Sequence, residues 1–246
     1  LVGKEILLVE DNELNMEIAE FVLQNEGAEV SKAWNGEETV ELFRKSESGE
    51  FVDSIGELIE LCSRRDLKII GDHNVENALA AAAICFFAGI ERDVIAKTLT
   101  EFGGVEHRIE YSGEINGVKF YNDSKGTNVD AAVIALRAIN KNIILIAGGD
   151  GKDQSFDELV KNFEGRVKHM ILLGRDGRII AEAADRNGFK EYTFAKDMPE
   201  CVNKAFEMAH PGDTVLLSPA CASWDMYDNF EQRGDHFKEC VARLGL

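Results

Sequence analysis

From residue 107 to its C-terminus, the chain alternates short apolar runs of strand character with longer segments whose apolar residues follow helical spacing. This rhythm restricts the fold to the α/β class, in which a mostly parallel sheet carries helices on both faces; here the sheet is expected to begin with a hairpin. Ligands of such folds bind at the edge where the strands have their carboxyl ends. Strands are expected at 108–113, 116–121, 142–147, 168–173, 190–194 and 213–217, and helices at 129–139, 156–163, 177–187, 198–208 and 228–244.

The first 50 residues have a β-α-β-α pattern of their own. The apolar run 5–10 and the segment 28–33 suit strands, and the residues between them carry helical apolar spacing. A second helix is expected to end near Lys45. The polar stretch KSESGE at 45–50 then indicates a first domain boundary.

The next segment is expected to be mainly helical. Residues 51–66 suit a helix and LKII at 67–70 a brief strand, while DHNVENALAAAAICFFAGI and ERDVIAKTLTEF each suit a helix. Gly103-Gly104 ends this helical segment and gives a second candidate boundary. The sequence therefore predicts three parts, at 1–50, 51–106 and 107–246.

The composition indicates a strongly acidic, soluble globular protein. Its net charge of -18 argues against a nucleic-acid partner, because binding to phosphate backbones requires clustered Lys and Arg. The longest apolar run, at 78–90, is much shorter than the roughly 20 residues of a membrane span, and no signal peptide opens the chain, so no membrane association is expected. Five scattered cysteines without a C-x-x-C pair favour reduced thiols in the cytoplasm. The histidines lack metal-ligand spacing, so no metal ligand is assigned.

The stretch YNDSKGTNVDA at 121–131 joins an expected strand to an expected helix. Asp123 could accept hydrogen bonds from ribose hydroxyls, and Lys125 offers a positive charge to an anion. Thr127 would lie at the helix N-terminus, where amide donors and the helix dipole favour anions. The alternative is a well-capped turn, but the lysine just before the helix favours an anion site.

Two later loops also follow expected strands. LIAGGDGKDQSF presents Lys152 but does not satisfy the phosphate-loop pattern G-x-x-x-x-G-K-[ST]. LLSPACASWDMYDNFEQRGDHF carries Ser223, and Cys221 in it has no evident histidine partner and is expected to be an inert thiol. We expect these loops to line a common crevice suited to carboxylate or phosphate groups. Its expected members are Lys125, Lys152, Arg175 and Ser223.

Three other places carry polar side chains with two interpretations each. Asn77 lies one turn into an expected helix and could reach a ligand, although capping of that helix accounts for the surrounding polar residues. Arg108 is suited to pair with phosphate or carboxylate, although on its own an exposed strand arginine is the simpler interpretation. Glu10 and Asp11 suit either a divalent cation or an acidic helix N-terminus.

The stretch ILLVEDNELNMEIAEFVLQNEGAEVSKAWNGEETVELF resembles the first half of response-regulator receiver domains. In that family, the residues matching Glu10 and Asp11 help to bind magnesium beside a phospho-accepting aspartate. The resemblance stops near Phe51, and no run carrying that aspartate follows. It therefore implies a half-receiver without phosphorelay chemistry of its own.

From about Phe51 onward the chain resembles the Mur ligase family, and within it the members that add D-glutamate. The motifs are GDHNVENALAAAA, EHR, NDSKGTN, GGDGKD, LLGRDG and LLSPACASWDMYDNFEQRGDHF. The resemblance implies that 51–106 is a remnant of the central domain and that 107–246 is the Rossmann-like C-terminal domain. It also implies a ligase of peptidoglycan precursor synthesis that uses ATP and Mg to activate a UDP-linked muramoyl substrate, which D-glutamate then attacks.

The same resemblance assigns two groups of binding residues and no catalytic residue. The positions expected to contact the nucleotide are Asn77, Arg108 and Asp123. The positions expected to hold D-glutamate and the reacting carboxylate are Lys125, Thr127, Lys152, Ser223 and the backbone near Phe230.

The sequence departs from the family in its central domain. The Gly-Lys-Ser/Thr phosphate loop and the segments that carry the family's metal-binding Glu and His do not occur in the 246 residues. Without this stabilisation of an acyl-phosphate step, the chain alone is expected to have no appreciable ligase turnover. The alternatives are a chimeric or engineered receiver-like interaction module without catalysis, or a fold recombinant with no native function. Because the two N-terminal strands would expose sheet edges, docking on 51–103 or self-association is also expected.

Overall fold

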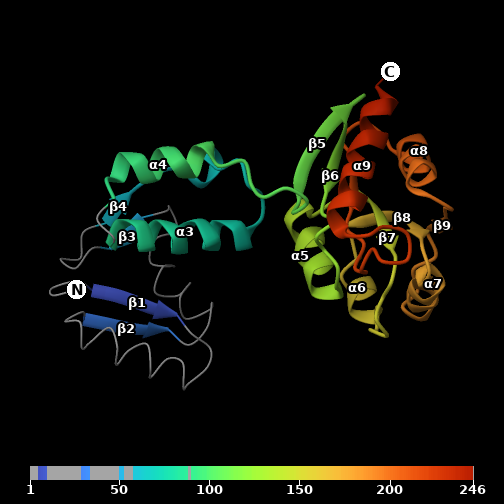
Figure 1. Ribbon diagram of the computed structural model, residues 1–246, viewed down its shortest axis with the longest axis horizontal. Helices are drawn as coiled ribbons and strands as arrows, with labels where there is room; N and C mark the ends of the chain where they lie inside the picture. The colour runs from blue at the N-terminus through green and yellow to red at the C-terminus, as the bar shows by residue number, and fades with distance from the viewer. Residues whose placement is uncertain (1–4, 10–28, 34–49, 53–57, 88–89, 246) are drawn as a thin grey trace. The chain divides into compact units, whose positions relative to one another are not determined.

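A computed structural model describes residues 5–9, 29–33, 50–52, 58–87 and 90–245 of the protein (Figure 1). Contacts divide the chain into a unit that ends at Gly103 and a unit that begins at Gly104, at the glycine pair named above as a candidate boundary. The division at residue 50 stays a prediction.

The first two strands of the N-terminal unit form a parallel pair. Strand β1 (Glu5–Val9) runs beside β2 (Glu29–Ala33), with Glu5 opposite Glu29 and Val9 opposite Ala33. Both expected strands are therefore confirmed, and their parallel pairing suits a β-α-β connection. The two helices expected in the first 50 residues lie outside the described residues, as do Glu10 and Asp11.

The segment after residue 50 differs from the expected helix. Strand β3 (Glu50–Val52) pairs antiparallel with β4 (Leu58–Glu60), and a 3-10 helix η1 (Arg64–Asp66) follows. A capping box between Ser63 and Asp66 closes this short turn. The helix expected over 51–66 is therefore wrong, and LKII at 67–70 is not a strand. A short apolar run has no period long enough to separate a helix from a strand.

The two expected helices of this unit are present as α3 (Asp72–Phe87) and α4 (Arg92–Glu101). They pack against each other through the small side chains of Ala82 and Ala83 on α3 and through Ile95 on α4. Alanine is the best helix former, and its small side chain lets helix backbones approach closely. The Ala-rich segment is therefore suited both to form a helix and to pack against another helix.

A six-stranded sheet forms the centre of the C-terminal unit, with the strand order β5-β6-β10-β7-β8-β9 (Figure 1). Strands β5 and β6 pair antiparallel, as the expected opening hairpin, and all other pairs are parallel. The expected α/β fold with a mostly parallel sheet is thus confirmed. The strands are β5 (Glu110–Ile115), β6 (Val118–Asn122), β7 (Ile143–Gly148), β8 (Val167–Leu173), β9 (Tyr192–Phe194) and β10 (Thr214–Leu217).

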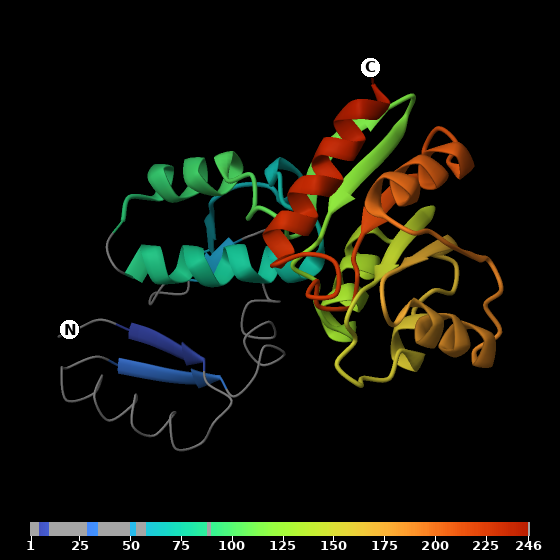
Figure 2. The same ribbon diagram turned by 45° about the vertical axis from the view of Figure 1, so that its right-hand side comes forward.

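Helices cover both faces of this sheet (Figure 2). On one face, Val202 of α8 and Phe237 of α9 pack against alternate strand residues, such as Phe120 and Ile146. Because strand side chains alternate between faces, Leu145 and Leu172 point to the opposite face, on the side of α5, α6 and α7. The helices are α5 (Val129–Ile139), α6 (Asp157–Lys161), α7 (Gly177–Arg186), α8 (Met198–Met208) and α9 (Phe230–Leu244).

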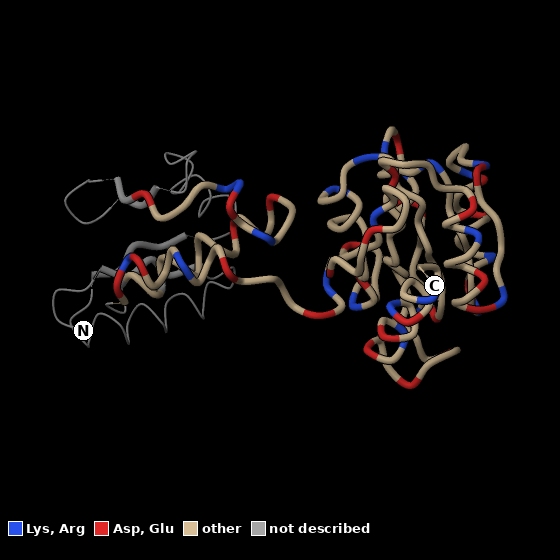
Figure 3. Tube along the Cα trace, turned by 90° about the horizontal axis from the view of Figure 1, so that it is seen from above, with Lys and Arg blue, Asp and Glu red and all other residues tan. Residues whose placement is uncertain are grey.

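Charges of both signs are distributed around the C-terminal unit. Figure 3 shows Lys and Arg positions interspersed with Asp and Glu positions, rather than gathered in a stripe along one element. Among the described residues, the helices are too short or too polar to cross a lipid bilayer.

Candidate functional site

Four loops meet at the edge where the parallel strands of the C-terminal unit have their carboxyl ends. We call this place the carboxyl edge; its loops are 122–128, 148–155, 174–177 and 218–229. Backbone hydrogen bonds tie the loops together: the Asp123 amide donates to the Leu217 carbonyl at 2.7 Å, and Asp150 and Ala222 exchange bonds at 2.8 and 2.9 Å. The site is therefore fixed by the sheet and by contacts between its own loops.

Asp123 is a buried acid at the centre of the carboxyl edge, and its side chain is fully hydrogen-bonded. Its Oδ2 accepts from the Ser218 hydroxyl at 2.7 Å, and its Oδ1 accepts from the Ile109 amide at 3.2 Å. Burial raises the pKa of Asp123 to about 7, although these bonds and the nearby Arg108 and Arg233 oppose the shift. An acid whose pKa lies near neutrality in a ligand-facing loop is a functional-site candidate.

Gly126 allows this loop to fold closely around the acid. A Cβ atom at this position would lie 2.5 Å from Asp123 Oδ2 and 3.0 Å from Ser218 Oγ. A side chain at position 126 would therefore displace the carboxylate from the Ser218 hydroxyl.

Arg233, on helix α9, links two of the loops to each other. Its side chain is only 2% exposed, and it donates from Nε to Ser124 Oγ at 2.9 Å and from Nη2 to the Ser124 carbonyl at 2.8 Å. Its Nη1 donates to the Cys221 carbonyl at 3.1 Å. Burial lowers the Arg233 pKa to about 10, so the guanidinium remains charged at neutral pH. Its bonds hold the loop at 122–128 against the loop at 218–229.

A second buried network lies beside this one and centres on His107. Its Nδ1 lies 3.0 Å from the Asn122 side-chain nitrogen, which also donates to Glu110 at 2.9 Å. A Cβ atom at Gly234 would lie 2.2 Å from His107 Nδ1, so helix α9 can approach the imidazole only with glycine at that position. The sequence analysis missed both Arg233 and His107 as site-forming residues.

Two lysines on the carboxyl edge lie over aromatic rings. Lys125 Nζ lies 5.7 Å from the centroid of the Phe230 ring, and Lys152 Nζ lies 4.5 Å from the centroid of the Trp224 ring. Both lysines are exposed, and no ion pair among the described residues includes either of them. Their charges are therefore available to an anion.

Arg175 differs from these lysines. Its guanidinium is ion-paired with Asp150 and, at 3.4 Å, with Asp176, while its amide donates to Asp225 at 2.8 Å. The expectation that Arg175 faces a common crevice stays a prediction, but Asp150 and Asp176 balance the charge of its guanidinium. No spacing in the sequence indicates the pairing with Asp150.

The backbone is strained at several residues of these loops and of the segment just before β5. Positive φ angles occur at His107 (62°), Ile109 (46°), Lys152 (51°), Asp153 (59°) and Ala220 (55°). The other non-glycine residues with positive φ in the described part of the chain are asparagines, which adopt this region more readily. A β-branched residue such as Ile109 adopts it rarely, and strain of this kind concentrates at functional sites.

The remaining predicted residues have varied positions. Ser223 is 2% exposed, and its carbonyl accepts from the amides of Met226 and Tyr227. Thr127 is half-buried and precedes Asn128, which caps helix α5. Asn77 is exposed on α3 in the N-terminal unit, so its grouping with Arg108 and Asp123 stays a prediction.

Cys221 is buried, and burial raises the pKa of its thiol to about 12. A thiol with such a pKa is protonated at neutral pH and is a poor nucleophile, in agreement with the expectation of an inert cysteine.

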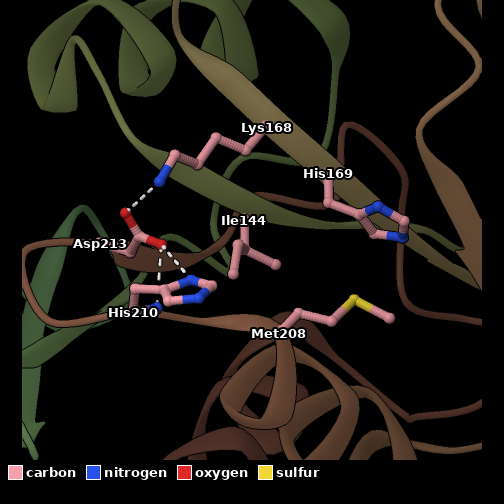
Figure 4. A pocket seen from close by; sticks show the side chains of 6 residues that line it. All are labelled: Ile144, Lys168, His169, Met208, His210 and Asp213. Atoms are coloured by element: carbon pink, nitrogen blue, oxygen red, sulfur yellow. Dashed lines mark hydrogen bonds and ion pairs between the residues drawn. The ribbon is translucent and has the colours of Figure 1, made fainter.

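A pocket lies near the other ends of the strands, away from the carboxyl edge (Figure 4). Lys168 Nζ is bound there by Asp213 Oδ1 at 2.6 Å, and Asp213 Oδ2 accepts from the His210 amide at 3.0 Å. Asp213 thus balances the lysine charge and closes a turn before β10. The lining residues are Ile144, Lys168, His169, Met208, His210 and Asp213, none of which the sequence analysis assigned to a site.

Comparison with known proteins relates the site to a family. Residues 107–221 match the family described as "Mur ligase, glutamate ligase domain". The chain is 51% identical over 196 residues to the UDP-N-acetylmuramoylalanine--D-glutamate ligase of Thermoanaerobacter sp. (strain X514), covering 79% of this chain and 43% of that protein. It is 44% identical over 254 residues to the enzyme of the same name from Alkaliphilus oremlandii (strain OhILAs), covering 94% of this chain and 56% of that protein. The chain thus spans about half the length of these curated relatives.

Solved structures share the fold at lower identity. MurF from Acinetobacter baumannii is 17% identical with a TM-score of 0.59, covering 99% of this chain and 52% of that one. The UDP-N-acetylmuramate-alanine ligase of Thermotoga maritima is 22% identical with a TM-score of 0.54, covering 72% of this chain and 40% of that one. At these identities the likeness supports the fold alone.

Proposed function

Because residues 107–221 belong to the glutamate ligase domain family of the Mur ligases, we propose that the carboxyl edge binds the amino acid that such a ligase adds. The name shared by the curated relatives points to D-glutamate as that amino acid. The proposal concerns a binding site carried by the C-terminal unit. The activity of a whole ligase is a further step, considered below.

The observation that carries the proposal is the pair of lysines without acidic partners, Lys125 and Lys152. Both follow strands that pair parallel with β10 or β8, so they lie at the edge where ligands of such folds bind. D-glutamate presents two carboxylates at neutral pH, and each is suited to bind one ammonium group.

The assignment of ligands to individual residues follows the resemblance to the family. We assign D-glutamate and the reacting carboxylate to Lys125, Thr127, Lys152, Ser223 and the backbone near Phe230, and the nucleotide to Asn77, Arg108 and Asp123. The reaction would join D-glutamate to UDP-N-acetylmuramoylalanine, with ATP activating the carboxylate, in the cytoplasm. Ser223 is buried, so its hydroxyl can contact only a ligand that enters the loop. Lys125 and Lys152 are open to solvent.

The described residues do not fit a magnesium ion. Among them, no three His, Cys, Asp or Glu side chains gather as a metal site. The phosphate-loop pattern of the family's central domain is likewise absent from the 246 residues. We therefore assign no step to the metal or to the ATP phosphates in this chain.

This disagreement gives a prediction about activity. The chain alone is expected to release no phosphate above background when ATP, magnesium, D-glutamate and UDP-N-acetylmuramoylalanine are supplied together, because the acyl-phosphate step lacks its electrostatic stabilisation. A coupled phosphate assay checks this. Phosphate release that requires all the substrates would contradict the prediction.

Binding of D-glutamate tests the proposed function directly. Replacing Lys152 or Lys125 by methionine is expected to weaken D-glutamate binding about tenfold or more, since each change removes one charge-assisted hydrogen bond worth roughly 1.5–3 kcal/mol. Isothermal titration calorimetry on the full chain measures the effect. The matched control is Lys190→Met, because Lys190 is exposed and pairs with Asp185 away from the site. Equal affinity in all the lysine variants would overturn the proposal.

The alternative to a ligase remains a receiver-like interaction module. The parallel pairing of β1 with β2 suits the first β-α-β of a receiver, and it suits other α/β folds equally well. Labelling of the chain by acetyl phosphate would favour the alternative. Self-association through the N-terminal strands also stays a prediction.

A further inference from the structure

We propose that Trp224 is a positioning residue of the amino-acid site: its indole ring holds the Lys152 ammonium over the carboxyl edge without neutralising it. This inference rests on the proposed function and adds to it a residue that no family assignment above includes. Trp224 is 66% exposed, more than any other large apolar side chain given for the described residues. Trp224 directly follows Ser223 in the loop at 218–229 of the carboxyl edge.

The contact joins two loops that are already fixed to each other. Lys152 Nζ lies 4.5 Å from the centroid of the Trp224 ring, within the range of a favourable cation–π contact. The bonds between Asp150 and Ala222 place the backbones of the two loops side by side just before both residues. The Lys152 amide donates to Asp150 Oδ1 at 3.1 Å, which holds the lysine in its strained backbone conformation. The backbone around Lys152 is therefore held in place, and the freedom of movement that remains is that of the lysine side chain.

Three of the acids in the loops around Lys152 bind other groups. Asp150 binds the Arg175 guanidinium, Asp176 accepts from the Gly151 amide at 2.7 Å, and Asp225 accepts from the Arg175 amide at 2.8 Å. A carboxylate in the place of Trp224 would neutralise the lysine and compete with an anionic ligand. An aromatic ring attracts the ammonium through its quadrupole and leaves the net charge unchanged.

Lys125 repeats the arrangement less closely, with its Nζ at 5.7 Å from the Phe230 ring. Both aromatic residues belong to the segment that follows β10, so one segment supports both lysines. Cation–π attraction is strongest for tryptophan and weakens with distance. We therefore expect the larger effect at Trp224.

The test is a set of variants of the full chain titrated with D-glutamate by calorimetry. Trp224→Leu is expected to weaken binding about fivefold, corresponding to a contact at an exposed site, and Trp224→Phe to restore most of the loss. The matched control is Tyr111→Leu, an aromatic residue that is 55% exposed on β5, which is expected to bind as the wild type does. Because Trp224 is exposed, none of these changes is expected to unfold the chain.

A double-mutant cycle separates positioning from general loop structure. If Trp224 acts through Lys152, Trp224→Leu causes no further loss in a Lys152→Met background. Losses that add in full, or a Trp224→Leu variant that binds as tightly as the wild type, would overturn the inference while leaving the proposed function intact. A wild-type chain that gives no saturable binding would overturn the proposed function and the inference with it.

The two tryptophans of the chain, Trp34 and Trp224, supply an independent signal. In a Trp34→Phe background, D-glutamate is expected to change the fluorescence of Trp224 with the same midpoint as the calorimetric titration, and this change is expected to be lost in Lys152→Met. Saturable binding without a fluorescence change would count against the contact in the bound state.

Discussion

Replacing Arg233 by methionine is expected to lower the free energy of unfolding of the C-terminal unit by about 2–4 kcal/mol, because hydrogen bonds from a charged donor are lost and buried acceptors are left without one. The change removes every donor to the Ser124 carbonyl, the Ser124 hydroxyl oxygen and the Cys221 carbonyl. A buried acceptor left without a donor costs roughly 1–3 kcal/mol. The methionine side chain keeps most of the apolar contacts of the arginine stem, so the loss reports the hydrogen bonds.

Urea unfolding of the wild type and the variants measures the loss of stability. Hydrogen exchange of the amides of β7 and β10 reports this loss for the C-terminal unit. Arg178→Met is the matched control, because Arg178 is exposed on α7. Arg233→Lys is expected to fall between the wild type and Arg233→Met, since an ammonium group cannot reproduce the planar fork. An Arg233→Met variant as stable as the Arg178→Met control would show that the two loops do not depend on this side chain.

Replacing Asp123 by asparagine is expected to raise the free energy of unfolding at pH 8 by up to about 4 kcal/mol, from a pKa shift converted at 1.36 kcal/mol per unit. The pKa of Asp123 in the folded protein, about 7, lies above its ordinary value of 3.8. Between these values the folded state binds more protons than the unfolded state, so stability falls as the pH rises from about 4 to about 7. Asparagine keeps an acceptor for the Ile109 amide and cannot ionise, so the variant loses this pH dependence.

The check is the free energy of unfolding of wild type and Asp123→Asn at pH 5 and pH 8. The difference between the two proteins is expected to be smaller at pH 5 than at pH 8 by roughly 2–3 kcal/mol, because only the first part of the loss between about pH 4 and pH 7 has occurred at pH 5. Asp228→Asn, a change at an exposed aspartate outside the buried network, is the control. A pKa of Asp123 raised by burial would be contradicted if the difference in free energy of unfolding between wild type and Asp123→Asn did not change with pH. A buried acid that lowers the stability of its own protein is typical of a binding or catalytic site.

The fold of the C-terminal unit could be predicted because its elements are long and separated by clear breaks. Helix α5 occupies residues 129–139 as expected, and α8 occupies 198–208. The segment at 50–70 could not be predicted in the same way. Phe51, Leu58 and Ile59 suit a strand as well as a helix, and the β3–β4 pairing that decides between them depends on partners several residues apart.

The position of the two lysines at the carboxyl edge was predictable, whereas the contacts that hold its loops in place were not. Lys125 and Lys152 follow strands directly, and the carboxyl ends of parallel strands meet at one edge. Arg233 lies 109 positions from Ser124, and Gly234 admits His107 only through its missing side chain. The pairing of Arg175 with Asp150 was not predictable for a related reason, because the two residues lie in different loops. Contacts across such separations leave no local pattern in one sequence.

The most direct test of the central claim is to map where D-glutamate binds on the full chain by NMR. Amide resonances of the carboxyl edge, at 123–128, 150–153 and 221–225, are expected to shift in a saturable way on addition of D-glutamate. Resonances of α8, and of His210 and Asp213 at the opposite end of the strands, are expected to stay unchanged. Saturable shifts confined to those other places, or no saturable shift anywhere in the C-terminal unit, would contradict the assignment of the carboxyl edge as the amino-acid site.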